Sequence, residues 1–173
     1  MKFSIDGYEI RQAKTTVDNR DDFLQTIKGI AQQYSTHIIC FDADRMAGRE
    51  HAESAIQHAL RSFLSAKPIS NSFEMEALLF ASGSRQCNAA TSFGIHAGKN
   101  TMFVCICPVK EGVWKELAQH MHFIPEKKDT WTPKKVKRLM TLFDITQNEL
   151  ELVGIYRLKD LILERIALLE VSR

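Results

Sequence analysis

The chain has 173 residues, of which 45% are hydrophobic and 25% are charged, and its formal net charge is +2. These proportions are ordinary for a soluble globular protein, and a chain of about 150 residues typically buries about 70% of its unfolded surface, so residues 1–173 are expected to form a single domain. The net charge is too small to indicate a nucleic-acid partner by itself, although local clusters of basic residues remain possible.

The N-terminus carries no basic and apolar signal sequence, and no apolar run is long enough to cross a bilayer. The cysteines are Cys40, Cys87, Cys105 and Cys107, and their spacing contains neither a C-x-x-C pair nor a zinc-binding pattern. Free thiols are typical of a reducing compartment. We therefore expect a cytoplasmic protein (or a nuclear one, if eukaryotic) without a metal ion, a cofactor or a membrane partner.

The N-terminal part predicts strands and one helix. Residues 3–5 and 8–13 indicate a short hairpin around Asp6-Gly7, a dipeptide that suits a tight turn. Asp18 or Asn19 can cap the helix that follows, and the acidic residues in its first turn favour it. Apolar stretches at residues 37–41 and 101–108 predict the two strongest strands.

Three successive helical segments between residues 51 and 94 form the centre of the predicted fold. Apolar residues at i, i+3, i+4 spacing predict a helix from His51, which Pro68 prevents from continuing. Residues 73–82 are apolar on almost every side, which is typical of a helix buried in the core. Ser72 is suited to cap this core helix and Gly83 to end it.

One carboxylate, that of Glu76, lies within the apolar core helix. Burying an unpaired charge is strongly destabilising, so a partner is expected. Arg85, at the start of the next helical segment, is the nearest basic candidate in the sequence. We therefore predict a structural ion pair between Glu76 and Arg85, with a binding or catalytic role for either residue as the alternative.

The C-terminal part predicts mainly helices. Residues 110–121 suggest one helix, and Thr132 and Pro133 suit the N-cap and the first position of the next. Thr146 and Glu149 have the spacing of a capping box, and an apolar stripe marks a final helix. Because strands are few and helices many, we predict a mixed α/β (α+β) fold with a small, mostly antiparallel sheet covered by several helices.

One face of the helix from His51 carries polar and basic side chains. At about 100° per residue they fall within about one third of the circumference, opposite the apolar stripe. The members of this polar strip are His51, Ser54, His58, Arg61, Ser62 and Ser65, with Arg49 and Lys67 flanking its ends. Such a strip could contact a sugar–phosphate chain, and the alternative is an ordinary solvent-exposed face.

A catalytic alternative comes from the strand HIICF, which ends in Asp42-x-Asp44. This pattern resembles the nucleophile loop of haloacid-dehalogenase-type phosphatases, where the first carboxylate attacks phosphorus and the second acts as acid/base near Mg²⁺. Lys110 and Glu111 follow the next strand, but the downstream acidic pair of such a site is missing. The competing interpretation is that Asp42 and Asp44 are turn and cap residues.

The run PKKVKR, residues 133–138, resembles a nuclear import signal. It lies on the polar side of a predicted helix, which favours a solvated face. Lys134 and Lys135 stand in the first helical turn, however, where positive charge opposes the helix dipole. A surface that faces phosphate groups would account for this placement.

Several short motifs together resemble one known family. They are G-R-x-H at residues 48–51, A-x-R at 59–61 and E-x-L-L-x-x-S-G-x-R-Q at 76–86. This pattern resembles the Cgi family of small regulatory subunits of the KEOPS complex. Phe80 and Cys87 depart from the usual tyrosine and isoleucine but keep an apolar side chain. The late segments NELELVG and DLILERIALLEV extend the resemblance over most of the chain.

The resemblance implies a non-catalytic subunit that binds the Bud-type kinase/ATPase and the single-stranded 3′ CCA end of tRNA. It would thereby support formation of threonylcarbamoyladenosine by the transferase subunit of the complex. The residues expected to contact tRNA are Arg49, His51, His58, Arg61, Lys67 and Arg85. The aromatic and methionine candidates for kinase contact, whose alternative is ordinary core, are Trp114, Met121, Phe123 and Trp131. A pure protein–protein scaffold remains an alternative, as does the phosphatase.

Overall fold

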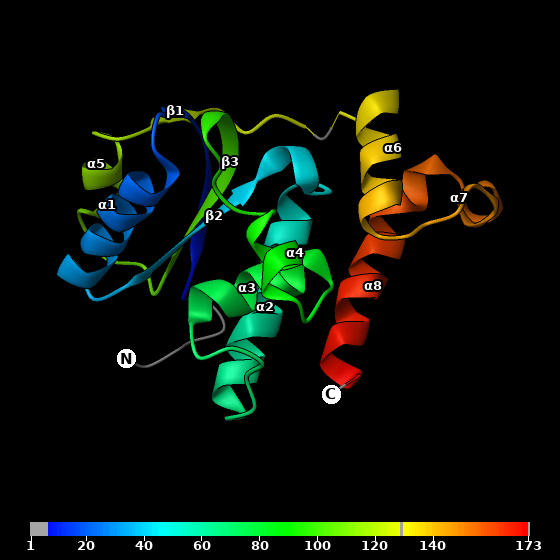
Figure 1. The fold of residues 1–173 in the computed structure, drawn as a ribbon, viewed down its shortest axis with the longest axis horizontal. Coiled ribbons are helices and arrows are strands. Elements are labelled where there is room, and N and C mark those ends of the chain that lie inside the picture. The colour runs from blue at the N-terminus through cyan, green and yellow to red at the C-terminus, as the bar shows by residue number, and fades with distance from the viewer. Residues whose placement is uncertain (1–6, 129, 173) are drawn as a thin grey trace.

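The computed structural model describes residues 7–128 and 130–172. Its centre is one antiparallel sheet of four strands in the order β2-β3-β1-β4 (Figure 1). The strands are β1 (Glu9–Val17), β2 (His37–Asp42), β3 (Gly98–Cys107) and β4 (His122–Ile124). The predicted fold class, a mixed α+β domain with a small antiparallel sheet covered by helices, is confirmed.

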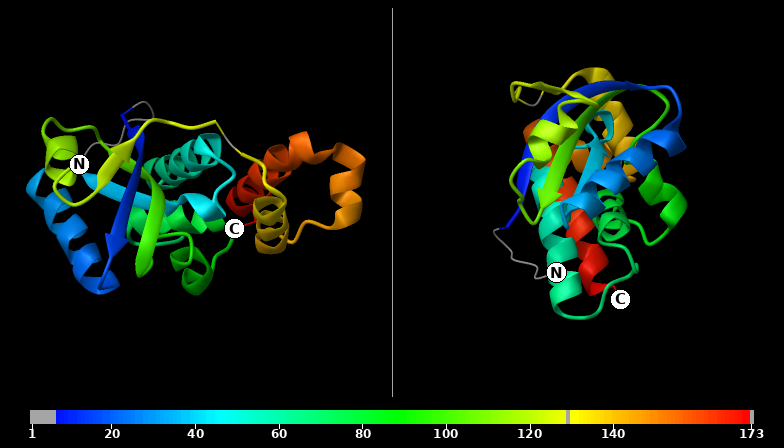
Figure 2. Two further views of the ribbon diagram at one scale, coloured as in Figure 1. Left: turned by 90° about the horizontal axis from the view of Figure 1, so that it is seen from above. Right: turned by 90° about the vertical axis from the view of Figure 1, so that its left-hand side faces the viewer.

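Helices cover both faces of the sheet, because successive strand residues point to opposite sides. On β2, Ile38 and Cys40 pack toward α1 (Arg20–Gln33) and the short α5 (Val113–Leu117). Ile39 and Phe41 pack toward α2 (Arg49–Leu64) and α3 (Phe73–Ser82) on the other face. Figure 2 shows this arrangement, with the sheet between the two groups of helices.

The core helix α3 forms where the sequence predicts it. The Ser72 side chain accepts a hydrogen bond from the Met75 N–H, which caps the first turn. Gly83 ends the helix in the left-handed conformation, with a φ of 64° that favours glycine. Of the large apolar side chains of α3, Phe73, Leu79 and Phe80 are buried, whereas Met75 and Leu78 are half-buried.

The C-terminal helices form a layer beyond α2 and α3, at the end of the molecule far from α1 (Figure 1). They are α6 (Pro133–Leu142), α7 (Gln147–Val153) and α8 (Leu158–Val171). The predicted N-cap at Thr132 and the capping box of Thr146 with Glu149 are both present. Short helices complete the fold at Ala43–Arg45 (η1), Cys87–Thr91 (α4) and Ile155–Arg157 (η2).

Two predicted elements differ from the structure. The helix expected over residues 110–121 is reduced to α5, and a turn over residues 118–121 leads from it to β4. The N-terminal hairpin lies partly outside the described residues, and the part that is described, β1, pairs with β3 and β4. No helix among the described residues is long and apolar enough to cross a membrane.

The described cysteines are all free thiols. Cys40, Cys105 and Cys107 are buried in the sheet, whereas Cys87 is exposed. Burial raises the pKa of Cys40 to about 12 and that of Cys107 to about 11. These thiols are therefore protonated and act as small apolar side chains of the core.

Candidate functional site

The polar strip of α2 is largely covered by other helices. His51 is fully buried, and His58 and Ser62 are nearly so. The reason is that α3 and α8 pack along α2 on this side. The prediction that His51 and His58 are available on an exposed strip is therefore wrong, since the polar side of α2 forms a second packing interface.

His51 is a structural residue with a defined tautomer. Its Nδ1 accepts a hydrogen bond from the Ala47 N–H at 2.9 Å, so the proton lies on Nε2, which donates to the Ala81 carbonyl at 2.8 Å. Burial lowers the pKa of His51 to about 4, against an ordinary value of 6.5. The ring is thus neutral at pH 7 and joins the loop before α2 to the last turn of α3.

His58 and Arg61 connect α2 to α8. His58 Nδ1 is hydrogen-bonded to the Glu170 carboxylate, and its ring stacks on Phe80 with centroids 5.1 Å apart. Arg61 Nε lies 3.7 Å from the same carboxylate. Burial lowers the pKa of His58, and the hydrogen bond to Glu170 opposes this shift. Both residues therefore stabilise the helix pair in this structure.

The predicted ion pair between Glu76 and Arg85 is not formed. The Glu76 carboxylate is fully buried and accepts hydrogen bonds from the N–H groups of Ile69 and Ser70, at 3.0 and 2.7 Å. Arg85 is exposed, and no ion pair joins it to Glu76 among the described residues. The sequence correctly indicates that Glu76 needs a partner, but backbone donors of the α2–α3 loop meet that need.

The basic residues predicted to contact tRNA are not gathered at one place. Arg49 starts α2 and pairs with Glu53 and Glu126, at 3.0 and 3.3 Å. Arg61 and Lys67 lie at the other end of this helix, which is 16 residues long and so spans about 24 Å at about 1.5 Å per residue. Arg85 lies between α3 and α4. The structure therefore does not support one continuous binding strip along α2.

A different set of basic residues surrounds a polar cavity of about 620 Å³. Residues from α1, η1, α6 and the segment before β3 line it, among them Arg20, Arg45, Arg138 and His96. Arg20 Nε donates to the Ile95 carbonyl at 2.9 Å, and Arg138 Nη1 donates to the Asp44 carbonyl at 3.3 Å. These bonds position two guanidinium groups while leaving further N–H groups of each able to bind oxygen atoms. We call this site the arginine pocket.

The arginine pocket also contains the two aspartates of the phosphatase interpretation. Asp42 Oδ1 accepts a hydrogen bond from the Asp44 N–H at 3.0 Å and caps η1, as the cap interpretation predicts. Its Oδ2 lies 3.6 Å from His96 Nε2 and 3.8 Å from Arg45 Nε. Burial raises the pKa of Asp42. The described residues contain no cluster of three or more His, Cys, Asp or Glu side chains that could hold a metal ion.

Sequence reasoning did not find the arginine pocket. Its basic residues come from four separate elements, and no motif or spacing connects them. The one signal was the unfavourable charge of the run 133–138, whose last residue, Arg138, reaches the pocket. Arg138 is half-buried and lines the pocket, whereas Lys134 and Lys137 of the same run are exposed.

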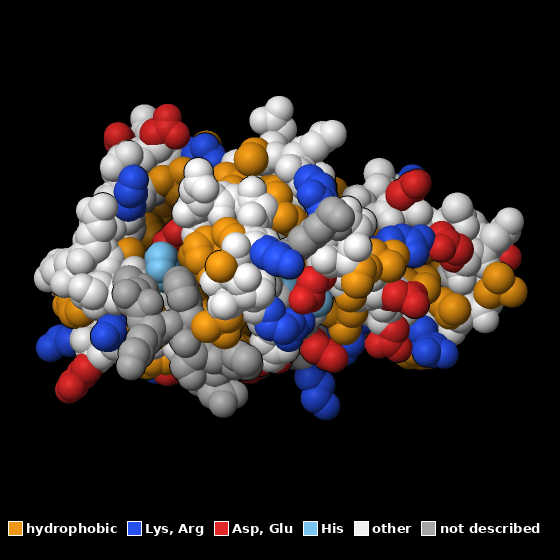
Figure 3. Space-filling model, turned by 90° about the horizontal axis from the view of Figure 1, so that it is seen from below, with side chains coloured by type: hydrophobic (Ala, Val, Ile, Leu, Met, Phe, Trp, Pro, Cys, Tyr) orange, Lys and Arg blue, Asp and Glu red, His pale blue; other side chains and the backbone are white. Residues whose placement is uncertain are grey.

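Most of the large exposed apolar side chains of the described residues belong to the C-terminal helices. Six such residues lie on α7, η2, α8 and the C-terminal end of α2: Leu64, Leu152, Ile155, Tyr156, Leu168 and Val171. Leu152 and Tyr156 are 87% and 93% exposed. We call this set the C-terminal apolar surface, and Figure 3 shows hydrophobic side chains among charged ones over this part of the molecule.

The residues proposed from sequence for kinase contact belong elsewhere. Met121 is buried, and Trp114 and Phe123 are partly buried against the hydrophobic core between the sheet and the helices α1 and α5. Trp131 packs against the hydrophobic core on the opposite face of the sheet, which includes residues of α2 and α3. Met121 thus belongs to the core, and Trp114, Phe123 and Trp131 pack against it with part of their surface exposed.

Comparisons with known proteins place the chain in a family. No curated protein matches the sequence. The sequence profile of one family, described as kinase binding protein CGI-121, matches residues 15–170. Among the described elements, this match covers α1 to α7, all but the last residue of α8, and the sheet from the last part of β1 onward. The chain therefore belongs to the CGI-121 family of kinase binding proteins.

Proposed function

We propose that the protein is a non-catalytic, kinase-binding subunit of a KEOPS-type complex, which also holds the single-stranded 3′ end of tRNA during threonylcarbamoyladenosine formation. The observation that carries this proposal is the family match over residues 15–170. The direct protein partner is accordingly the Bud-type kinase/ATPase. The transferase subunit is an indirect partner, which the protein reaches through the kinase.

The C-terminal apolar surface is the site that best fits a kinase. Interfaces are enriched in tyrosine and other large apolar residues relative to the remaining surface. Of the large hydrophobic residues that are exposed in the described chain, only Val109 lies outside this surface. The basic and acidic residues around it, such as Arg157 and Asp160, supply the polar rim that a non-obligate interface carries.

The kinase test uses the full chain and the purified Bud-type kinase. Leu152→Asp and Leu168→Asp are each expected to weaken binding at least about tenfold, since a charge on either residue would be desolvated at the interface. Val109→Asp is the matched control, because Val109 is an exposed apolar residue of the loop between β3 and α5, outside the C-terminal helices. Unchanged binding by both surface variants would exclude this docking site, and loss of binding in the control as well would indicate a folding effect.

The arginine pocket is the site that best fits the tRNA end. Arginine binds phosphate through paired N–H groups, and the pocket places three arginines around a cavity of about 620 Å³. His96 is about half exposed there; its Nδ1 donates to the Ala97 carbonyl at 2.9 Å, and its Nε2 lies 3.6 Å from Asp42 Oδ2. Arg85 precedes α4, which lines the same pocket, so of the residues predicted from sequence it is the nearest along the chain to this site.

The tRNA test compares intact tRNA with tRNA trimmed of its terminal CCA. Arg45→Gln and Arg138→Gln should weaken binding of intact tRNA, and the same variants should make little further difference for trimmed tRNA. Arg157→Gln serves as control, because Arg157 is exposed on η2, away from the pocket. Equal binding of intact and trimmed tRNA would contradict the proposal. If only Arg61→Gln and Arg85→Gln weaken binding of intact tRNA, the binding site consists of residues predicted from sequence and not of the arginine pocket.

A further inference from the structure

β2 is an edge strand of the sheet as the structure describes it. Among the described residues it pairs with β3 only, so no described strand pairs with its other long side. The Asp42 N–H donates to the Phe93 carbonyl at 2.7 Å and not to β3, so it points outward. Backbone groups of alternate residues point to the same side of a strand, so the N–H and C=O of Ile38 and Cys40 face the same open edge.

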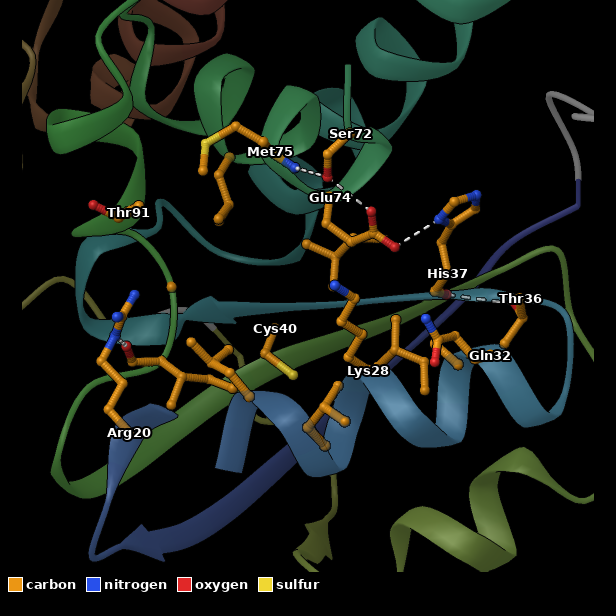
Figure 4. Close-up of a pocket in the computed structure, with 18 of the residues that line it drawn as sticks. Arg20, Lys28, Gln32, Thr36, His37, Cys40, Ser72, Glu74, Met75 and Thr91 are labelled. Atoms are coloured by element: carbon orange, nitrogen blue, oxygen red, sulfur yellow. Dashed lines mark hydrogen bonds and ion pairs between the residues drawn. The ribbon is translucent and has the colours of Figure 1, made fainter. Parts of the chain in front are cut away.

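This open edge lies at the bottom of a groove. A cavity of about 650 Å³ runs along β2 between α1 and α3 (Figure 4). Leu24, Ile27 and Ala31 form the α1 wall, and Met75 and Leu78 form the α3 wall. The walls are thus mainly apolar, while the floor offers backbone hydrogen-bonding groups.

We infer that this groove binds an extended peptide segment of a partner protein, which adds to β2 as a further strand. Such a segment would satisfy the outward N–H and C=O groups of Ile38 and Cys40 by strand pairing. Its side chains would point alternately to the α1 wall and the α3 wall, so both sets would be apolar, as in strands covered on both faces. At about 3.4 Å per residue, four or five residues would cover the open part of β2.

The recessed position of β2 favours a lone segment over a second copy of the chain. The edge strand of a second copy would carry its own α1 and α3 on its two faces, and these would collide with the walls of the groove. An extended segment without covering helices meets no such obstacle. A strand edge recessed between two helices can therefore pair with a single extended peptide but not with the edge strand of another folded domain.

The composition of the groove favours peptide over single-stranded RNA. Unpaired bases are usually held by stacking on aromatic rings, and no phenylalanine, tyrosine or tryptophan lines the groove among the described residues. The ring of His37, which does line it, is hydrogen-bonded to Glu74 and lies 5.0 Å from that of Phe73. The basic side chains of Arg20 and Lys28 lie on the α1 side, whereas the acidic group of Glu74 is hydrogen-bonded to His37 at 2.6 Å and to Ser72 at 3.0 Å (Figure 4). A peptide with an acidic residue beside its apolar stretch would complement this rim.

The experiment begins with a displayed library of random heptapeptides, selected on the full-length protein. Selected peptides are expected to contain an apolar stretch with an acidic residue at one side. A synthetic copy of the best peptide should slow hydrogen exchange of the Ile38 and Cys40 amides. The oligonucleotide CCA is run in parallel as the RNA probe.

Backbone methylation of the peptide tests strand pairing without altering the protein. N-methyl groups on alternate residues that face β2 should reduce affinity at least about tenfold, and N-methyl groups on the intervening residues should have little effect. Lys28→Glu should also weaken binding, and Lys14→Glu, on the exposed side of β1, is the matched control. Failure to select any peptide, equal effects of both methylation patterns, or amide protection by CCA alone would overturn the inference, whatever the outcome of the kinase and tRNA tests.

Discussion

Two buried polar side chains, His51 and Glu76, hold the backbone around the central helices. Each lies in an apolar environment and each is satisfied by main-chain groups of a neighbouring loop or helix end. A buried polar group that keeps its hydrogen bonds specifies one arrangement, because any other arrangement would leave it unsatisfied. His51 and Glu76 therefore stabilise the arrangement of α2, α3 and the loops that precede them.

The first prediction concerns Glu76. Replacing it with glutamine puts an N–H₂ group against one of two backbone donors, so Glu76→Gln should lower the free energy of unfolding by about 2 kcal/mol. Arg85→Ala should change it by less than about 0.5 kcal/mol, as expected for an exposed residue without a structural bond. Urea denaturation of both variants measures this difference. A large effect of Arg85→Ala on the free energy of unfolding would indicate that the ion pair with Glu76 predicted from sequence does form.

The second prediction concerns the pH dependence of stability. The folded-state pKa of His51, about 4, lies below the ordinary value of 6.5. The unfolded chain therefore takes up a proton that the folded chain does not, so the stability is complete above pH 6.5 and decreases as the pH falls toward 4. Between pH 7 and pH 5 the loss due to His51 should be about 2 kcal/mol.

The control for this prediction is His51→Gln. The glutamine amide can occupy the place of Nε2 and donate to Ala81, but it does not titrate in this range. Its unfolding free energy should consequently depend less on pH than that of the unchanged protein. The remaining dependence includes His58, whose pKa burial also lowers. If the variant shows the full pH dependence, His51 is not the group responsible.

At the scale of elements, the sequence predicts those helices and strands whose signals are local. Ser72 and Gly83 delimit α3, Thr146 and Glu149 cap α7, and the apolar run from His37 forms β2. The surroundings of α2 could not be predicted in this way, because α8, about one hundred residues later, covers its polar face. β4 was missed for a similar reason, since this strand of three residues exists by pairing with β1.

The third prediction separates packing from binding on α8. Ile166 of α8 is fully buried in the core, whereas Leu168 of the same helix is 52% exposed. Ile166→Ala should cost about 3 kcal/mol of unfolding free energy, because it leaves a cavity. Leu168→Ala should cost less than about 1 kcal/mol and should nevertheless weaken kinase binding. Thermal and urea unfolding give the first comparison, and titration with the kinase gives the second.

At the scale of the whole molecule, the candidate sites use different parts of the fold. The C-terminal apolar surface belongs to α7, η2, α8 and the end of α2, and the arginine pocket and the β2 groove lie around α1, η1 and the segment before β3. Family and fold class could be predicted from sequence because motifs and helix signals are continuous along the chain. The arginine pocket could not, because Arg20, Arg45 and Arg138 meet only after folding.

The last prediction follows from this separation and concerns salt. If Arg138 contacts a phosphate of single-stranded RNA, Arg138→Gln should reduce the slope of log K against log salt concentration by about 0.7, which corresponds to one lost contact. Kinase binding should keep its affinity, since Arg138 lies on α6 and outside the C-terminal apolar surface. The slopes are measured by titrating tRNA at several salt concentrations with each protein. A variant that binds tRNA more weakly with an unchanged slope would show that Arg138 acts through the shape of the pocket, by its bond to the Asp44 carbonyl, and not through a phosphate contact.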